Sequence, residues 1–484
     1  MTMNKNIKQI FAVAVFLLGS SAQAQNLSSA YFLDGFAYGH QMNPAKEYDR
    51  KGYFSIPFLP GNLNMGLKGN LNLKDVLFKN PNGNGLVTYL HPSLSVGEAL
   101  SGFNANNKLL TDLRWDLLSF GFHAFKGYNT VNVGIRANVG MNMPYEIFEL
   151  TKNLTNKDYN VSNLGATASA WTEIALGHSH NIIPGVRIGI KAKAMLGVGY
   201  ADIKMDNLDL NLTGTDRWTA MANATAEVGI KGFTWGETVL KEYNSKKNPD
   251  GTPATYEQID FDNIDVDGFG LNGFGLGFDL GAEVDLGKMG LVDGLKLSAS
   301  LLDLGYIKWT NVAVAQNRGE EFVFEGFDDI NVDGENGTDF EDQANDLADR
   351  LSDLYSLQSA GVGSKKRSMG ATLNIGVEYA LPAYDKLSFG FLSTSRLQGV
   401  YSWNEERISA TISPCKMLEF SANVGFGTLG TNVGWILNFH PRSFSLFIGS
   451  DHCVGKLSKQ FIPLRSNYDI SMGINFPIGK SRIK

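Results

Sequence analysis

A glycine-rich stretch is the first part of the sequence whose residues could do chemistry. Gly268–Gly287 reads GFGLNGFGLGFDLGAEVDLG and contains a G-x-G-x-x-G match, at Gly268, Gly270 and Gly273. The dinucleotide fingerprint needs a helix directly after the glycines, so that the helix N-terminal amides meet the pyrophosphate. Here apolar residues recur at every second position from Phe274 to Leu286, which predicts a strand instead. We therefore expect no phosphate site here or at the second match, Gly425, Gly427 and Gly430.

The carboxylates of the same stretch are a second candidate site, made of Asp279, Glu283 and Asp285. They share one face of the predicted strand, and paired carboxylates can do acid–base work when one pKa is raised. The same residues also suit the polar wall of a water-filled lumen. We favour the interpretation that these carboxylates line the lumen or the rim of a β-barrel, the fold that the residue alternation described below predicts.

A third candidate is the run His178-Ser179-His180. Two histidines at i and i+2 share a strand face and could chelate a metal or, with Ser179, indicate an outer-membrane hydrolase. No other member of a catalytic constellation is identifiable, and a turn, Ile183–Gly185, follows at once. We favour polar residues near a membrane interface and expect no enzyme.

A calcium-binding half-motif is the fourth candidate. Residues 329–334 read DINVDG and match the first six positions of an EF-hand loop, with the oxygen ligands Asp329, Asn331 and Asp333. The twelfth position should be a bidentate Glu and is Phe340, and a second half-motif at 263–268 also reaches a Phe, at 274. A loosely bound divalent ion in an outer loop stays an alternative. The prediction is no metal site and no cofactor.

The first residues predict export. Lys5 and Lys8 precede the apolar run Ile10–Leu18, and Ala22-Gln23-Ala24 then supplies an A-x-A cleavage site, so residues 1–24 are interpreted as a signal peptide. The apolar run is too short to span a bilayer as a helix, which takes about 20 residues. A net charge of -7 with no basic cluster argues against a nucleic-acid partner. The two cysteines, Cys415 and Cys453, are expected to be unpaired.

Alternation of apolar and polar residues dominates the rest of the chain. It is clearest in the segments Val131–Met143, Val186–Tyr200, Ala371–Leu381, Leu418–Phe426, Thr431–Phe439 and Ile470–Ile478. Soluble sandwich strands have mostly about 5–6 residues, whereas a tilted strand that crosses a bilayer takes about 9–11. These long segments, about 14 in all, predict an all-β fold: a closed transmembrane antiparallel barrel with its apolar face to lipid.

Three regions break the alternation. Residues 25–60 are expected to form a plug in the lumen of the barrel of residues 61–484, whose long loops are 241–267 and 320–363. A short helix is expected in the second loop, because Leu347, Leu351, Leu354 and Tyr355 lie on one helical face. Candidate ligand-binding residues of the plug are Phe32, Asp34, His40 and Asn43. Candidates on the lumen wall are Lys191, Lys193, Asp279 and Glu283.

Several segments together resemble a known family: FLDGFAYGHQMNPA at 32–45, MPYEIFEL at 143–150, FGLGFDLGAEVDLG at 274–287 and LKLSASLLDLGYIKW at 295–309. The chain resembles an uncharacterised outer-membrane barrel family common in Bacteroidetes, remotely similar to FadL-type transporters and PorV-like barrels. The resemblance implies a barrel of about 14 strands with an N-terminal segment in its lumen. It assigns no role to any single residue. Many outer-membrane barrels end on an aromatic residue, whereas here Phe476 is followed by PIGKSRIK.

Two functions follow as expectations for a barrel in the outer membrane of a Gram-negative bacterium. The first is a FadL-like passive channel for a hydrophobic small molecule, which predicts an apolar pocket beside the plug and an interruption in the hydrogen bonding of the wall. The second is a binding, assembly or secretion-accessory barrel that acts through its extracellular loops. Expected partners are outer-membrane lipid, a hydrophobic ligand and the barrel-assembly machinery.

Overall fold

The computed structural model describes residues 27–480 except 58, 60, 84, 154, 156, 214–216, 237, 261–263, 267, 269, 318, 320, 325–355 and 454–466. Three expectations lie outside the described residues. They are the signal peptide of residues 1–24, the helix at Leu347, Leu351, Leu354 and Tyr355, and the loop candidates Asp329, Asn331 and Asp333.

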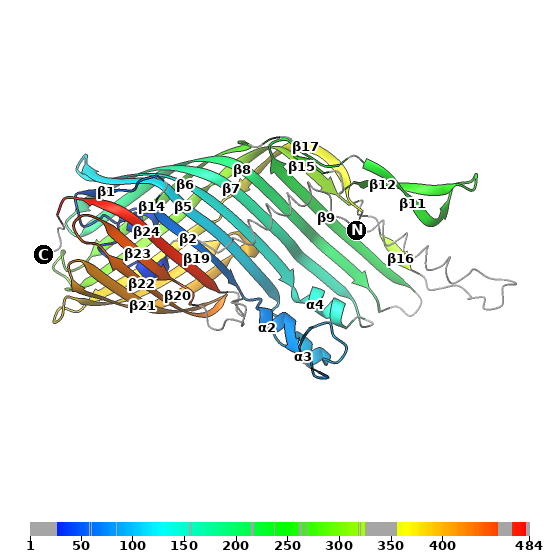
Figure 1. Ribbon diagram of the computed structural model, residues 1–484, viewed down its shortest axis with the longest axis horizontal. Coiled ribbons are helices and arrows are strands. Elements are labelled where there is room, and N and C mark those ends of the chain that lie inside the picture. The colour runs from blue at the N-terminus through cyan, green and yellow to red at the C-terminus, as the bar shows by residue number, and fades with distance from the viewer. Residues whose placement is uncertain are drawn as a thin grey trace.

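One antiparallel sheet closes on itself as a barrel (Figure 1). Thirteen of its positions are single strands, in ring order β5 (Asn106–Ala124), β6 (Gly127–Pro144), β7 (Tyr159–Ile183), β8 (Val186–Asn211), β14 (Gly273–Asp285), β15 (Leu295–Gln316), β18 (Ala371–Ala380), β19 (Leu387–Leu397), β20 (Trp403–Cys415), β21 (Leu418–Gly427), β22 (Gly430–Phe439), β23 (Ser445–Ser450) and β24 (Tyr468–Ile478). The fourteenth is shared by β1 (Gly52–Phe54) and β2 (Asn62–Gly69), which both pair with β24 and β5. The prediction of an all-β barrel of about 14 strands is confirmed.

Other strands extend the wall or lie outside it. β9 (Trp218–Ile230) continues the line of β14 along β8, and β17 (Gln358–Ser368) continues the line of β18 along β15. The remaining pairs are β3 (Leu77–Lys79) with β4 (Leu86–Thr88), β10 (Phe233–Thr234) with β13 (Asp265–Val266), β11 (Thr238–Lys247) with β12 (Pro253–Ile259), and β16 (Phe322–Phe324) with β9. The region 241–267, expected to be a loop, therefore contains strands, and β17 begins inside the expected loop 320–363.

Helices are few and short in the described part of the chain. They are α2 (Leu73–Val76), α3 (Val96–Leu100), α4 (Tyr145–Lys152) and the 3-10 turns η1 (Ser28–Ala30), η2 (Gly39–Gln41) and η4 (Gly399–Tyr401). None of the helices in the described residues is long and apolar enough to cross a bilayer. Both cysteines are free, exposed thiols.

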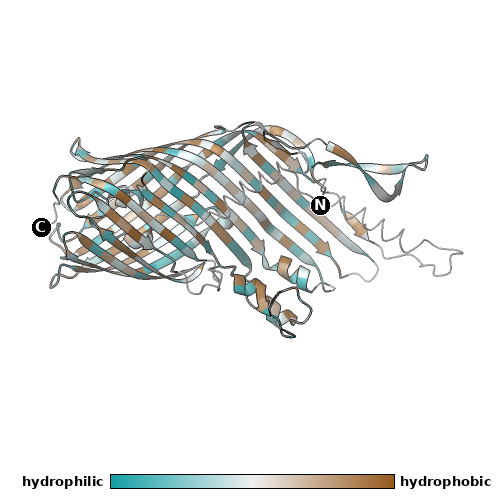
Figure 2. Ribbon diagram, in the orientation of Figure 1, coloured by the Kyte–Doolittle hydropathy of each residue, from teal (hydrophilic) through white to brown (hydrophobic). Residues whose placement is uncertain are grey.

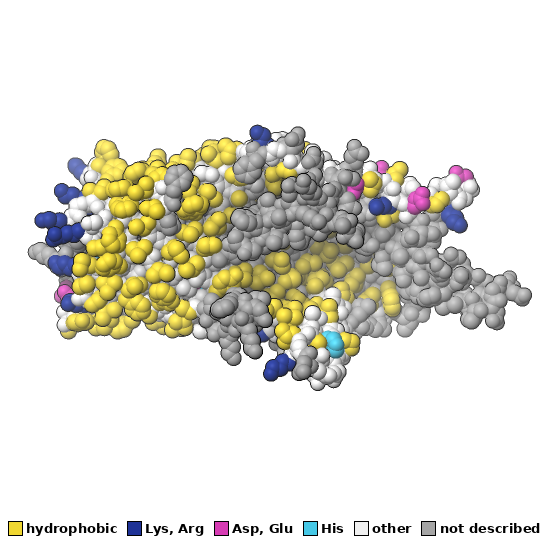
Figure 3. Space-filling view, in the orientation of Figure 1, with side chains coloured by type: hydrophobic (Ala, Val, Ile, Leu, Met, Phe, Trp, Pro, Cys, Tyr) yellow, Lys and Arg dark blue, Asp and Glu magenta, His cyan; other side chains and the backbone are white. Residues whose placement is uncertain are grey.

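The two faces of the wall differ in chemistry because successive strand side chains point to opposite sides. In β14, Phe274, Leu276 and Phe278 are exposed, whereas Gly275 and Gly277 between them are buried. Figure 2 shows the same alternation along many strands, and Figure 3 shows apolar side chains covering the half of the barrel with short turns. β7 and β8, with 25 and 26 residues, run well beyond this apolar band.

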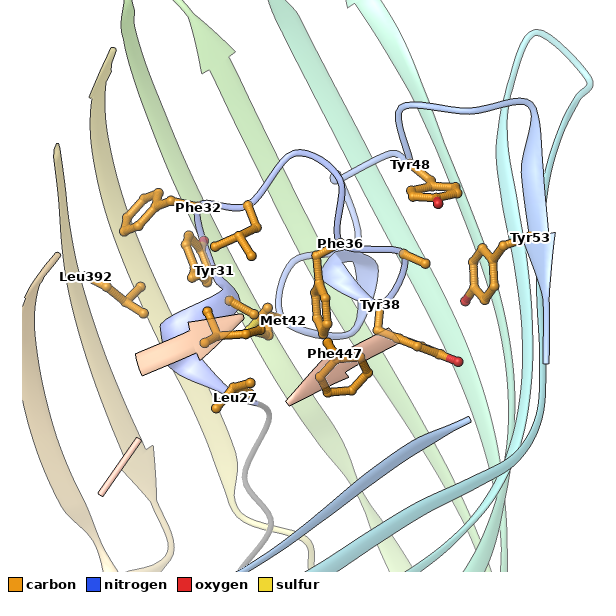
Figure 4. Close-up of a cluster of buried hydrophobic side chains, with 14 of the residues drawn as sticks. Leu27, Tyr31, Phe32, Phe36, Tyr38, Met42, Tyr48, Tyr53, Leu392 and Phe447 are labelled. Atoms are coloured by element: carbon orange, nitrogen blue, oxygen red, sulfur yellow. The ribbon is translucent and has the colours of Figure 1, made fainter. Parts of the chain in front are cut away.

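Residues 27–50, here called the lumen segment, lie inside the ring. Its aromatic side chains form a buried cluster with residues of opposite wall strands, including Leu392 of β19 and Phe447 of β23 (Figure 4). The carboxylate of Asp451 accepts hydrogen bonds from the backbone N–H groups of Ser28 and Ser29, both at 2.7 Å. The predicted range 25–60 thus includes a wall strand, β1. Closure of the lumen by the segment remains a prediction.

The glycines of the opening stretch make room for buried groups. A Cβ on Gly281 would overlap the side chain of Asn43, and one on Gly189 would overlap the Pro44 carbonyl. At the other end of β14, Gly273 faces the indole of Trp309. These glycines therefore leave space in which the lumen segment and the Trp309 side chain pack against the wall. The stretch continues as strand β14, so it lacks the helix that a phosphate site requires.

We expect Gly281→Val to loosen the lumen segment, because overpacking a filled site costs about 1–3 kcal/mol. Limited trypsin digestion of the folded barrel should then cleave after Lys46 several times faster than in the unaltered protein. Gly363→Ala is the control, since a Cβ there meets nothing within 4 Å. Equal digestion of both variants would contradict this role for the glycine.

Candidate functional site

An aromatic cavity lies in the lumen beyond the lumen segment. It has a volume of about 180 Å³. Its lining includes Trp171, Tyr200, Ile307 and Trp309 of β7, β8 and β15, Met369 directly after β17, and Tyr401 of η4. The rings of Tyr200 and Trp309 stack with centroids 5.5 Å apart. The buried indole N–H of Trp171 has no hydrogen-bond partner among the described residues. This cavity therefore offers aromatic and apolar faces.

Polar groups complete the wall of the aromatic cavity. Arg367 lines it and pairs with Asp202 at 3.2 Å and Glu227 at 2.6 Å. Ser169 also lines it and donates to the Asn138 side-chain oxygen at 2.8 Å. Seven of the thirteen lining residues are polar or charged, so the aromatic faces of this cavity lie among many polar groups.

A second cavity, of about 80 Å³, separates the aromatic cavity from the lumen segment. Trp171 lines both cavities, and Tyr31 and Met42 of the lumen segment form the inner end of the second one. Charged side chains also line it: Asp112, Arg114, Arg136, Glu173, Asp303 and Arg396. The expectation of an apolar pocket beside the lumen segment is therefore wrong for this cavity, because inward polar residues of six strands meet there.

All of these charged residues except Asp112 belong to one continuous network of ion pairs, in which Glu173 and Lys193 make the connecting contact at 4.0 Å. Asp116 lies 2.9 Å from Arg136, which lies 3.2 Å from Glu173. Lys193 then joins Asp279 at 2.7 Å and Asp303 at 2.6 Å. Opposite charges that alternate across neighbouring strands neutralise one another in a buried setting, where an unpaired charge would be costly. We call this network the charged belt. It also includes Arg114 beside Asp116, Lys191 beside Asp279 and Arg396 beside Asp303, so each of its charges has a partner of opposite sign.

The lumen segment is tied to this belt through two adjacent residues. Gln41 donates to Asp116 at 2.5 Å and accepts from Asn62 at 2.7 Å. His40 lies 2.7 Å from the Tyr53 hydroxyl, and Lys191 donates to the His40 carbonyl at 3.1 Å. Burial and the nearby Lys191 ammonium hold the pKa of His40 well below its ordinary value, so the ring is neutral at pH 7.

The wall is interrupted beside these residues. β1 ends at Phe54 and β2 begins at Asn62, and their partners on β5 are Phe120 and Asp116. From Phe54 to Asn62 the chain advances eight residues, whereas β5 advances only four from Phe120 to Asp116. The residues between β1 and β2 therefore cannot all pair with β5. Among its described residues, Ser55 alone keeps a backbone bond to the wall, to Ser119 at 2.8 Å. We call residues 55–61 the wall interruption.

Among the described residues of the wall interruption, Ile56, Pro57 and Leu59 are apolar and exposed, whereas Ser55 and Gly61 are buried. Its sequence, SIPFLPG, contains two prolines, which lack the N–H that a ladder requires. Ile56 and Leu59 are 42% and 40% exposed. Lipid hydrocarbon offers no hydrogen bonds, so prolines suit this position because they leave fewer donors unsatisfied.

The structure brings most predicted lumen residues together. Lys191, Lys193 and Asp279 are buried in the belt, and Asn43 donates to the Ala282 carbonyl at 3.1 Å. Phe32 lies in the buried aromatic cluster of the lumen segment. Two candidates lie apart from the belt: Asp34 pairs with Lys296 at 3.3 Å, and Glu283 lies on β14 toward the short turn. Ligand binding by any of them remains a prediction.

The remaining candidates do not assemble into a catalytic or metal site. Ser179 is buried and accepts a hydrogen bond from Arg187 at 3.3 Å, whereas His178 and His180 face each other at 3.2 Å on the opposite strand face. Asp285 pairs with Lys288 at 3.0 Å in a turn. In the described part of the chain, no three His, Cys, Asp or Glu side chains are placed to hold a metal ion.

Sequence reasoning missed the main residues of the belt and of the aromatic cavity. The pattern Asp112-x-Arg114-x-Asp116 in β5 was a usable signal, since it places charges on one strand face with Leu113 and Trp115 on the other. Asp303 gave no such signal. It sits at a β-bulge with a φ of 59°, which reverses the facing of the residues beyond it.

Comparisons with known proteins give one family and several similar solved structures. Residues 44–451 match a family described as "Family of unknown function (DUF5723)". No curated protein matches the sequence. Among solved structures, the chain is similar to the Ralstonia pickettii toluene transporter TbuX, with 7% identity, a TM-score of 0.38 and coverage of 92% of this chain and 93% of that one.

Two further solved structures are similar at the same level. For the P. putida toluene transporter TodX, the identity is 9% and the TM-score 0.39, with 90% of this chain and 92% of that one covered. For a Pseudomonas aeruginosa FadL homologue, the identity is 11% and the TM-score 0.39, with 94% and 98% covered. Values this low identify no ligand.

Proposed function

We propose that this chain, which belongs to the DUF5723 family of unknown function, is an outer-membrane barrel that passes a hydrophobic small molecule from its lumen sideways into the membrane. The wall interruption carries this proposal. A closed barrel has no free edge, and residues 55–61 are the place beside the lumen segment where the ladder is broken. A molecule that leaves there enters lipid and does not cross an aqueous compartment.

The cavities supply the inner part of the proposed route. Long loops and projecting strands mark the extracellular end of such barrels, and short turns mark the periplasmic end. A ligand from outside would meet the aromatic cavity first, where Trp171 and Trp309 offer apolar faces. It would next meet the charged belt, whose charges are paired with one another, and the lumen segment. Because Gln41 bonds both Asp116 and Asn62, movement of the lumen segment would act directly on the wall interruption.

A variant that fills the aromatic cavity tests the route. We expect Ser169→Phe to lower uptake at least about tenfold, equivalent to about 1.4 kcal/mol, because the ring occupies space that a ligand must enter. Uptake of a labelled long-chain fatty acid and of toluene into cells that carry the protein is the measurement. Ser169→Ala, which loses the same hydroxyl but leaves the space open, should transport normally.

The two variants also separate the main alternative, a barrel that acts through its loops. The β11–β12 hairpin projects away from the barrel (Figure 1) and favours that alternative. If Ser169→Phe and Ser169→Ala transport equally, the lumen is not the route and the channel proposal fails.

A further inference from the structure

Two lysines face outward at the extracellular side of the apolar band. Lys308 of β15 and Lys366 of β17 are direct cross-strand partners, and both are exposed. Neither makes an ion pair with any residue that the structure describes. Like charges that face each other directly across a sheet are destabilising, by up to about 1 kcal/mol. A negatively charged group from outside the chain would remove this repulsion by pairing with both lysines.

Neighbouring basic residues of the same run are already neutralised. Residues 365–367 read KKR, and alternation sends Lys365 and Arg367 to the inner face. There both pair with Glu227, at 3.0 Å and 2.6 Å. Of the three cations, only Lys366 is directed outward, beside Lys308.

Along the membrane normal, Lys308 and Lys366 lie where the apolar band of the barrel ends on its extracellular side. Outward apolar residues of β15 run from Leu295 to Tyr306, a span of twelve residues that includes the bulge at Asp303 and thus eleven ladder positions. A tilted strand crosses the hydrocarbon in about 9–11 residues. Lys308 is the next outward position toward the long loops, so its ammonium lies at the level of the outer-leaflet headgroups. Phe274 of β14 is its partner on the other side and is 53% exposed.

An aromatic ring positions one of the two ammonium groups. The Lys366 Nζ lies 3.6 Å from the centre of the Tyr306 ring, a cation–π contact. This contact holds the lysine stem against the apolar band and leaves its N–H donors available. A lysine at this level commonly directs its charge into the headgroup region while its methylenes cover apolar surface.

We propose that Lys308 and Lys366 form a binding site for the phosphate group of an outer-leaflet lipid. Two ammonium groups match the double charge of a phosphate, and each supplies several donors. Phe274, Leu304 and Tyr306, all exposed directly below, fit the acyl chains of the same molecule. A soluble anion would gain nothing from these apolar neighbours, so the geometry favours a lipid. The proposal rests on the outer-membrane location of the proposed function.

Lipid binding by the purified barrel tests the site independently of transport. The probes are a phosphorylated lipid A, the same lipid without phosphate, and inorganic phosphate. Retained lipid is counted by native mass spectrometry, and Tm is followed by thermal unfolding. We expect the double variant Lys308→Gln/Lys366→Gln to bind phosphorylated lipid A at least tenfold more weakly. The control Lys416→Gln, in the turn at the other end of the barrel, should bind normally.

Several outcomes would overturn the site. They are equal binding of the lipid with and without phosphate, unchanged binding by the double variant, and an equal Tm shift with inorganic phosphate. Without lipid, the double variant should be at least as stable as the unaltered protein, because a repulsion is removed. Its uptake of hydrophobic compounds should be normal, so loss of lipid binding and loss of transport are distinguishable.

Discussion

Deletion of residues 57–61 is expected to abolish uptake of hydrophobic compounds while the barrel folds normally. The register shows why this length is suitable. Phe54 and Leu63 pair with Phe476 and Met472 of β24, which have three residues between them. After the deletion, Ser55, Ile56 and Asn62 supply three residues between Phe54 and Leu63. β1 and β2 then become one strand in register with β24. On the other side, four residues of β5 separate Phe120 from Trp115, so one residue of β5 stays as a bulge, where β5 already has a register shift against β6.

The deletion also preserves the facing of the side chains. Ser55 and Asn62 are buried and Ile56 is exposed, as a continuous strand with Phe54 and Leu63 outward requires. The added backbone hydrogen bonds should make the deletion variant at least as stable as the unaltered protein. The temperature at which the folded barrel changes its mobility in a gel measures this stability. Transport should fall to the level of cells without the protein. The control replaces residues 57–61 by five glycine and serine residues, which keeps the interruption and should keep most of the uptake. Normal uptake by the folded deletion variant would refute lateral exit.

Replacement of Asp116 by Ala is expected to lower the free energy of unfolding by about 3–5 kcal/mol, the usual effect of breaking a buried ion pair. Asp116 is fully buried, and it accepts from Arg136 at 2.9 Å and from Gln41 at 2.5 Å. Without it, a buried guanidinium loses a counter-charge, and the lumen segment loses its bond to the belt. Denaturant unfolding of the barrel in lipid measures the loss.

Two controls separate charge from packing. Asp116→Asn keeps an acceptor oxygen but not the charge and should lose an intermediate amount of stability. Asp112→Ala removes a carboxylate on the same face of β5 that makes no ion pair with a described residue, so it should cost less. Equal losses for Asp112→Ala and Asp116→Ala would mean that the ion pairs of Asp116 add nothing to stability.

Much of the fold was predictable because alternation is a local property. Val186–Tyr200 was predicted as a strand and lies in β8, and the prediction that Lys191 and Lys193 face the lumen agrees with their burial there. The predicted strand Leu418–Phe426 is β21, nearly residue for residue. Successive side chains of a strand point to opposite faces. The residues of each face could therefore be assigned from the sequence without knowing which strands are neighbours.

The wall interruption was missed although it had a signal. The run SIPFLPG has two prolines three residues apart and was assigned to the plug because it lacks alternation. Pro in a strand marks an edge or a break, yet the sequence does not tell which strands flank it. Only the pairing of β1 and β2 with the same two neighbours, β24 and β5, identifies residues 55–61 as part of the wall.

The sequence by itself determined that this protein is a barrel and, except beyond bulges such as that at Asp303, which side chains of each strand face inward. Tertiary structure alone decided which inward side chains meet. Asp116, Arg136 and Gln41 come from two strands and the lumen segment, and they join only because ring closure and register place them at one height. Alternation fixes the face of a side chain but not its height against a distant strand, since height depends on bulges such as that at Asp303 and on strand pairing. For that reason the aromatic cavity, the charged belt and the interrupted wall are properties of the closed ring.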